Sequence, residues 1–301
     1  MRMSNQSTSR LDKGLIKVFK KAIACYLPDK LYLTLLFRHR FGYWMDWNNP
    51  QTFNEKLQWL KLYYRKSIFT IMVDKYLVKQ YVSEKIGEEY VIPLLGVWNR
   101  PEDIDFNKLP NQFVLKCNHT SGVGLAICKD KNKFDIESAI RELNKGLKNN
   151  YYSFAREWPY KNVSRKIIAE KYMADKKQSS LNDYKFYCFG GKPKFLYYSS
   201  GLENHSTARI TFLTLDWNRA PFQRIDYRQH ETLPSKPSKF NEMVSIAEKL
   251  SVGLPFVRVD LFQINDDIYF SELTFYPCAG YMNFNPKRYD KIVGDYLNLS
   301  V

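Results

Sequence analysis

The chain has 301 residues, which suits two domains or one large domain with subdomains and allows a sizeable core. An apolar content of 45% and an aromatic content of 16% exclude an intrinsically disordered protein. The net charge of +15, from 46 lysines and arginines against 31 aspartates and glutamates, favours a polyanionic partner. Nucleic acid, an anionic membrane surface and an acidic polymer all meet that description.

The five cysteines are scattered, and no two have the C-x-x-C spacing of a zinc site. We recognise no signal peptide, so we expect a cytoplasmic protein with reduced thiols. The longest apolar stretches are shorter than the roughly 18–20 residues that a membrane span needs.

Residues 1–50 predict a basic, helical N-terminal extension. Within it, residues 13–27 place apolar side chains at helical spacing with lysines between them. This pattern is typical of a helix that rests on an anionic membrane, and equally of a helix packed on its own protein. A position at the inner face of the membrane is therefore one alternative for the location of the protein.

Residues 51–110 are interpreted as an N-terminal subdomain. Thr52 and Glu55 form a capping-box pattern that opens a helix through about Tyr64. Helical spacing continues over residues 71–85, and a short strand with turns is expected over residues 90–98.

Residues 111–172 are interpreted as a second subdomain that carries a glycine loop. Lys116 ends a strand, and the loop that follows offers small residues and two glycines. Such loops let backbone N–H groups close on phosphate oxygens, although an ordinary Gly-rich hairpin is the alternative. A helix over residues 137–149 and a strand over residues 166–172 complete this part.

Residues 173–301 are interpreted as a C-terminal subdomain with strands at 183–189, 194–200 and 210–215. Residues 216–240 lack periodicity, which is typical of a lid, a binding loop or disorder. A helix over residues 241–250 precedes a hairpin. Strands mixed with segregated helices predict an α+β fold.

The hairpin carries the most informative pattern. If its loop is the three residues 265–267, Asp260 lies across from Glu272 and Arg258 lies across from Thr274, all on one face. Paired carboxylates are costly unless a cation lies between them, and Mg²⁺ is the natural candidate. A solvated hairpin with an Arg–Asp pair is the alternative. A loop of two or four residues would put the carboxylates on opposite faces.

Three further charged residues are candidates for a nucleotide site. Glu170 lies inside an apolar strand, where it would bind a ribose or an amine, or pair with a lysine. Lys185 would reach phosphates or lie in solvent. Lys75 follows Asp74 near an expected helix start and has the same two interpretations.

In chain order these features resemble the ATP-grasp ligases, and most closely the TupA-like (teichuronopeptide biosynthesis) branch. The resemblance covers about residues 50–295. It is carried by the segments Phe53–Trp59 (FNEKLQW), Asp74–Tyr76 (DKY), Val114–His119 (VLKCNH), Asp183–Phe186 (DYKF), Phe189–Pro193 (FGGKP) and Glu272–Pro277 (ELTFYP).

The resemblance implies an ATP-grasp fold, in which two antiparallel-sheet subdomains clasp ATP. The ATP-binding residues that it implies are Lys75, Lys116, His119, Ser121, Gly122, Gly124, Glu170, Tyr172 and Lys185. It also implies that Arg258 neutralises the transferring γ-phosphoryl group and that Asp260 and Glu272 bridge Mg²⁺ to the phosphates. Many ATP-grasp enzymes have Asn where this chain has Thr274, so water is an alternative ligand there.

The implied reaction is an ATP- and Mg²⁺-dependent joining of an amino acid or amine to a carboxylate through an acyl phosphate. The branch is associated with bacterial cell-surface polysaccharides, so the implied acceptor is a uronic acid of an acidic polysaccharide, such as a capsule, or of a lipid-linked precursor. The candidate acceptor contacts are His205, Arg209, Arg219, Arg224 and Arg228, with solvated loop charges as the alternative.

Two other classes are considered. A glycosyltransferase of the same pathway would hold a sugar nucleotide through a metal, for which Asp266 and Asp267 are the candidate ligands. Nucleic-acid binding is suggested by the charge and the 22 tyrosines. No basic stripe on a helix and no RNP-like aromatic pattern supports it, so we do not expect it.

Overall fold

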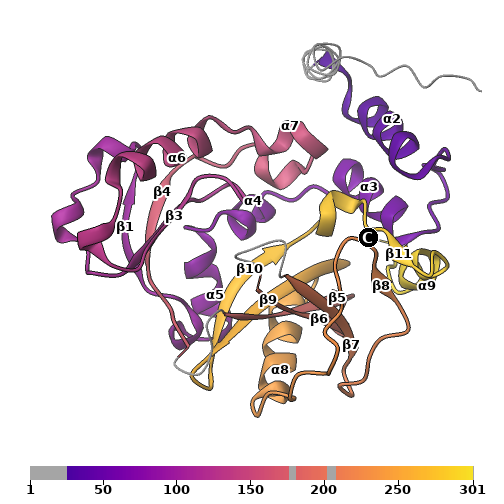
Figure 1. Cartoon of the computed structure of the whole chain (residues 1–301). Coiled ribbons are helices and arrows are strands. Elements are labelled where there is room, and N and C mark those ends of the chain that lie inside the picture. Colours follow the sequence, from indigo (N-terminus) through magenta and orange to yellow (C-terminus); the bar gives the residue numbers. More distant parts are fainter. Residues whose placement is uncertain (1–25, 176–180, 202–207, 301) are drawn as a thin grey trace, which may run out of the picture.

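Two antiparallel sheets form the frame of the computed structural model, which describes residues 26–175, 181–201 and 208–300 (Figure 1). The four-stranded sheet has the order β1-β4-β2-β3 and contains β1 (Leu94–Trp98), β2 (Phe113–Cys117), β3 (Leu125–Cys128) and β4 (Ile167–Lys171). The five-stranded sheet has the order β10-β9-β5-β6-β7 and contains β5 (Asn182–Phe189), β6 (Lys192–Ser200), β7 (Arg209–Thr214), β9 (Phe256–Ile264) and β10 (Asp267–Thr274). A small third sheet pairs β8 (Gln223–Arg224) with β11 (Phe284–Asn285).

Helices surround both sheets. The α-helices are α2 (Asp29–Phe41), α3 (Phe53–Tyr63), α4 (Ile68–Val73), α5 (Val78–Ile86), α6 (Ile136–Lys148), α7 (Tyr151–Ala155), α8 (Phe240–Ser251) and α9 (Tyr289–Asp295). The short 3₁₀ turns are η1 (Glu88–Tyr90), η2 (Pro101–Asp103), η3 (Phe106–Lys108), η4 (Lys131–Lys133), η5 (Trp158–Tyr160) and η6 (Pro277–Gly280). Figure 1 shows α6 beside the four-stranded sheet and α8 beside the five-stranded sheet.

Each sheet has its own hydrophobic core. The larger core joins the five-stranded sheet to α3, α4, α5 and α8, and the fully buried Phe53 ring lies 5.0 Å from that of Phe256. The smaller core contains Phe113, Leu115 and Leu143. Residues 51–110 are therefore divided: their helices pack on the five-stranded sheet, whereas β1 joins the other one. The predicted boundary at residue 110 does not coincide with a boundary between the sheets.

The predicted capping box is confirmed at the start of α3. The Thr52 hydroxyl accepts from the Glu55 backbone N–H, and the Glu55 carboxylate accepts from the Thr52 backbone N–H. The helical spacing over residues 71–85 is divided between α4, which ends at Val73, and α5, which begins at Val78. The break lies at the helix start expected near Asp74, whose carboxylate accepts from the N–H groups of Tyr76 and Leu77 and holds a turn there.

The hairpin has a two-residue loop, so the predicted three-residue loop is wrong. Asn265 and Asp266 have positive φ values of 51° and 71°, as a type I′ turn requires. A β-bulge at Ser271 adds one unpaired residue to β10 and shifts the register back. Asp260 therefore pairs with Glu272, and Arg258 with Thr274, as predicted.

Within residues 26–175, 181–201 and 208–300, no helix is both long and apolar enough to cross a bilayer. Two features of the sequence cannot be placed. Most of the amphipathic segment at residues 13–27, and the candidate acceptor residue His205, lie outside the described residues.

Candidate active site

A pocket of about 310 Å³ lies between the two sheets, next to the segment that connects them. Its walls come from β2, β3 and β4 on one side, from β9 and β10 on the other, and from α5. The apolar lining includes Val114, Leu125, Ile127, Met173 and Phe262. An apolar slot with a few polar groups suits a flat aromatic ligand.

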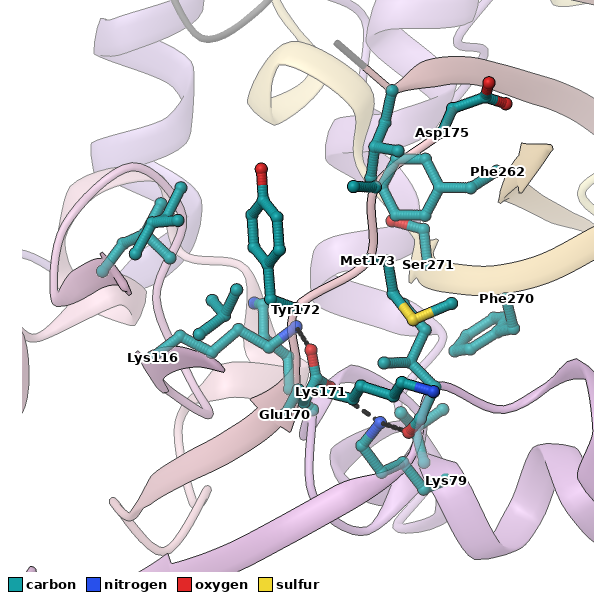
Figure 2. Close-up of a pocket in the computed structure, with 18 residues that line it drawn as sticks. Lys79, Lys116, Glu170, Lys171, Tyr172, Met173, Asp175, Phe262, Phe270 and Ser271 are labelled. Carbon is teal, nitrogen blue, oxygen red and sulfur yellow. Dashed lines mark hydrogen bonds and ion pairs between the residues drawn. The ribbon is translucent and has the colours of Figure 1, made fainter. Parts of the chain in front are cut away.

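Glu170 is the polar centre of this pocket. Its carboxylate lies 2.5 Å from the Lys116 ammonium and 2.7 Å from that of Lys79 (Figure 2). Burial raises the pKa of Glu170, but the two lysines outweigh burial and lower it below its ordinary value. Glu170 is therefore ionised and holds both ammonium groups at the pocket wall.

Lys75 links this pocket to the hairpin. Its ammonium donates to the carbonyl of Thr120 at 2.7 Å, and its backbone N–H donates to the carbonyl of Asn118 at 3.0 Å. Burial lowers the pKa of Lys75, and Glu272 is the acidic group that opposes burial most. The break between α4 and α5 thus places a lysine between the pocket and the predicted metal-binding carboxylates.

The predicted glycine loop is anchored at its start. Asn118 is fully buried, its amide donates to the carbonyl of Ser164 and its side-chain oxygen accepts from the backbone of Lys166. The His119 ring is 3% exposed and lies 3.2 Å from the carbonyl of Asn149. Its predicted contact with ATP stays a prediction, since here the ring packs inside the protein.

The end of the loop is also fixed. Gly124 has a φ of +72°, and a Cβ there would lie 2.7 Å from the Cys117 sulfur and 2.9 Å from the Cα of Gly146. Its backbone N–H donates to Glu142 at 3.0 Å. Gly124 therefore serves close packing against α6. The exposed Ser121 and Gly122 form the tip that is left to meet a phosphate.

The burial of His119 predicts a pH-dependent contribution to stability. Burial lowers the pKa of His119 from 6.5 to about 4. Between these values the unfolded chain binds a proton that the folded protein excludes, so this contribution is present above pH 6.5 and is lost as the pH falls. The difference in unfolding free energy between the protein and the His119→Gln variant should therefore become smaller by up to about 3 kcal/mol from pH 7 to pH 4.

Urea unfolding of the protein and the His119→Gln variant at both pH values measures this difference. Other titrating groups cancel because they are common to both proteins. A difference that stays constant with pH would contradict a neutral, buried His119.

The charged residues of the hairpin form two rows across the five-stranded sheet. One row contains Lys185, Asp260 and Glu272, and the next contains Arg258 and Thr274. Asp260 is fully buried, 2.8 Å from the Lys185 ammonium and 2.6 Å from the guanidinium of Arg258. The Arg258 guanidinium also donates to Thr274 at 2.9 Å and to Glu272 at 3.3 Å.

These charges hold one another ionised. Burial raises the pKa of Glu272, but Lys75, Lys185 and Arg258 outweigh burial and lower it to about 2. Burial lowers the pKa of Lys185, but Asp183 and Asp260 outweigh burial and raise it above its ordinary value. The cluster therefore offers fixed cations to a polyanionic ligand at neutral pH.

The two carboxylates differ in what they offer a metal. Among the described residues, no group of three or more His, Cys, Asp or Glu side chains converges on one point. The side chain of Glu272 is 32% exposed, which fits a cation bound jointly with phosphates. Both oxygens of Asp260 accept from Arg258 or Lys185, so in this conformation Asp260 neutralises those cations.

Three of the predicted acceptor arginines make hydrogen bonds within the segment of residues 209–231. Arg209 donates to the carbonyl of Gln229. Arg219 donates to the carbonyls of His230 and Glu231. Arg224 pairs with Asp226 through its Nε at 2.9 Å.

Arg224 is the most buried of these arginines, with a side chain 14% exposed, whereas Arg228 is exposed. Cys278 and Tyr197 lie near both the Arg224 guanidinium and that of Arg258, which is 5.7 Å from the centre of the Tyr197 ring. Arg224 therefore lies on the hairpin side of the site. Contacts of these residues with an acceptor stay predictions.

Lys79 is a site residue that the sequence reasoning missed. It lies four residues after Lys75, a spacing that places two side chains on one helix face, so a signal was present. The apolar lining residues, such as Ile127 and Met173, gave no signal. Their residue types and spacing are the same as those of core positions.

The class of protein follows from this geometry. Two antiparallel sheets with a lysine-lined pocket between them, and a carboxylate–arginine cluster on one sheet, are the arrangement of an ATP-grasp protein. The chain belongs to the TupA-like ATPgrasp family, whose model matches residues 55–298. The expected family and the α+β ATP-grasp fold are thereby confirmed, and with them the prediction of an enzyme of this class. Among curated proteins no match is found.

Several solved structures are similar to the chain at low identity. D-alanine–D-alanine ligase from Bacillus anthracis is 17% identical, with a TM-score of 0.44 over 75% of this chain and 66% of the ligase. D-alanine–D-alanine ligase from Helicobacter pylori is 14% identical, with a TM-score of 0.47 over 83% of this chain and 69% of the ligase. A RimK domain ATP-grasp protein from Sphaerobacter thermophilus is 12% identical, with a TM-score of 0.41 over 76% and 69%. The chain thus spans about two thirds of these proteins, and slightly less than that of the first.

Proposed function

We propose that the protein is an ATP-dependent carboxylate–amine ligase. The observation that carries the proposal is the position of Lys75. It lines the apolar pocket together with Lys116 and Glu170, and its charge interacts with Glu272, which belongs to the charged cluster around Arg258. In this arrangement the slot takes adenine, and the lysines take the phosphates.

The chemistry requires positioning and positive charge, and the chain supplies both. Transfer of the γ-phosphoryl group to a carboxylate makes an acyl phosphate, which an amine then attacks with release of phosphate. Negative charge develops on the transferring group, where Arg258 and Lys185 are held in place by Asp260. This reaction needs no protein nucleophile.

Mg²⁺ is part of the proposal. Glu272 would hold it, with Asp260 next to it and water or Thr274 completing the shell. Held there, it would supply positive charge against the phosphates. The partly exposed Glu272 carboxylate suits this role, and its low pKa keeps it ionised at neutral pH.

The proposed substrates are an amino acid or amine and a uronic acid of a bacterial cell-surface polysaccharide or its lipid-linked precursor. The net charge of +15 supports an acidic acceptor. ADP release screened over amino acids, with uronic-acid glycans as acceptors, tests this pairing. The same screen with neutral glycans should give no stimulation.

No observation favours the glycosyltransferase. Its candidate metal ligands, Asp266 and Asp267, are exposed at the hairpin tip, and Asp267 pairs with Lys239 at 3.2 Å. Thermal stabilisation by ATP with Mg²⁺, and none by UDP-sugars, is the expected result that separates the two classes.

Lys75→Ala should lower kcat/KM for ATP by about 100-fold or more, because a preorganised cation next to the phosphates is removed. ADP release at varied ATP concentrations measures this loss. The matched control is Lys192→Ala, whose side chain is 67% exposed and pairs with Glu248 on the surface. Equal activities of the two variants would contradict a phosphate-binding role for Lys75.

A further inference from the structure

The outer face of α2 exposes large apolar side chains. Leu31 and Leu35 are 46% and 45% exposed and lie one helical turn apart. Trp44, just beyond the helix, is 60% exposed, and the Arg38 guanidinium lies over its ring at 5.5 Å. We propose that this surface, called here the α2 face and made of Leu31, Leu35, Arg38 and Trp44, docks the protein on an anionic membrane.

These exposed residues are not the packing side of the helix. Leu33 and Phe37 are fully buried on the opposite side, and the Phe37 ring packs edge-on to that of Tyr43 at 5.3 Å. The helix is therefore already anchored through a separate set of apolar residues. A second apolar stripe on the solvent side adds nothing to folding and is typical of an interaction surface.

Positive charge is concentrated at this end of the chain. The first 41 residues contain nine lysines and arginines and two aspartates, a net charge of +7 out of +15. One of the two, Asp29, is paired with Arg65 at 2.9 Å and Arg156 at 3.1 Å. Lys30, Arg38 and Arg40 thus face solvent near the apolar residues, which is the charge expected opposite anionic headgroups.

The combination of residue types favours lipid over an acidic glycan. A glycan would engage the cations and the Trp44 ring, but it offers no apolar phase for the exposed leucines to enter. Tryptophan prefers the interface between headgroups and acyl chains, and arginine can keep its charge at the headgroups while its stem lies deeper. Since no described helix can cross a bilayer, contact from this face would be peripheral.

The α2 face lies close to the site without being part of it. Figure 1 shows α2 beside α3 and α7. The Phe41 ring lies 6.2 Å from that of Tyr281, which directly follows η6, the turn after the Glu272 strand. Docking through α2 would therefore hold the site near the membrane surface. This inference does not depend on which substrates the site takes.

Co-sedimentation of the full chain with vesicles tests the proposal. We expect binding to vesicles of equal parts phosphatidylcholine and phosphatidylglycerol, and little binding to phosphatidylcholine alone. Replacing both leucines, Leu31→Ser with Leu35→Ser, should weaken binding about tenfold or more, and Trp44→Ala should weaken it as well. Val252→Ser is the matched control, since Val252 is 69% exposed and directly follows α8, outside the α2 face.

Thermal unfolding and ADP release should be unchanged in all these variants, which separates a docking defect from a folding or catalytic one. Equal binding of the leucine variant and the Val252→Ser control would overturn the proposal, because charge elsewhere would then explain binding. Equal binding to neutral vesicles would also overturn it. So would a concentration-dependent dimer in sedimentation velocity that the leucine changes abolish, since a second copy would then cover the face.

Discussion

Asp260→Asn is expected to lower the free energy of unfolding by about 3–5 kcal/mol and to abolish ADP release. Asp260 is fully buried and neutralises the Arg258 guanidinium and the Lys185 ammonium, both within 2.8 Å. Burial raises the pKa of Asp260 above its ordinary value, and the two cations in contact with it oppose that rise. Asparagine has the same shape without the charge, so the variant leaves two cations buried with one carboxylate fewer.

Glu272→Gln is the matched variant. Glu272 is next to Asp260 in the same row, but its side chain is 32% exposed and its contact with Arg258 is 3.3 Å. We expect a loss of ADP release of about 100-fold or more with a smaller loss of unfolding free energy than for Asp260→Asn, because Glu272 is partly exposed. Urea unfolding and ADP release on both variants measure the two quantities. If Asp260→Asn were as stable as Glu272→Gln, Asp260 would not be the counter-ion of the cluster.

The pairing of Asp260 with Glu272 could be predicted from the sequence even though the loop could not. A three-residue loop without a bulge and a two-residue loop with a bulge give the same register beyond residue 271. Alternation of charged and apolar residues fixes which side chains share a face, because one face must be buried. It carries no information on where along the hairpin the extra residue lies.

Other differences have similar physical causes. The helical spacing over residues 71–85 is real, but spacing does not reveal that the Asp74 carboxylate caps a turn inside it. The glycine loop draws attention to Gly124, yet the sequence could not distinguish a glycine that approaches phosphate from one that approaches Gly146. Neither kind of glycine leaves room for a Cβ, and only the packing of α6 shows which kind Gly124 is.

The charged cluster could be predicted as a set of residues, but its internal neutralisation could not. Sequence reasoning paired the two carboxylates and placed a metal between them, with a solvated Arg–Asp pair as the alternative. In the structure both oxygens of Asp260 accept hydrogen bonds from Arg258 or Lys185. Of the two carboxylates, only Glu272 is open to a further cation. Lys185, which supplies one of these contacts from β5, is 75 residues away from Asp260 in the sequence.

Deleting Gln263 from β9 should abolish ADP release and destabilise the protein by more than about 3 kcal/mol. If β10 keeps its bulge, the deletion moves Glu272 opposite Val259, on the face that packs against α8 and Phe186. A carboxylate would then be buried in the core. In either case Phe270 takes the place opposite Asp260 and enters the charged row, and if the bulge is lost Glu272 lies opposite Arg258.

Deleting Ser271 from β10 is the matched change in the same hairpin, and we expect the opposite result. Ser271 is the unpaired residue of the bulge, so its removal leaves Phe270 opposite Leu261 and Glu272 opposite Asp260 in a regular ladder. The unfolding free energy should change by no more than about 1 kcal/mol, and ADP release should remain measurable. Urea unfolding of the two deletions decides the matter. Equal destabilisation by both deletions would show that the register at Glu272 depends on the bulge itself. The predicted contrast would show that the register depends on the number of residues between the turn and Glu272.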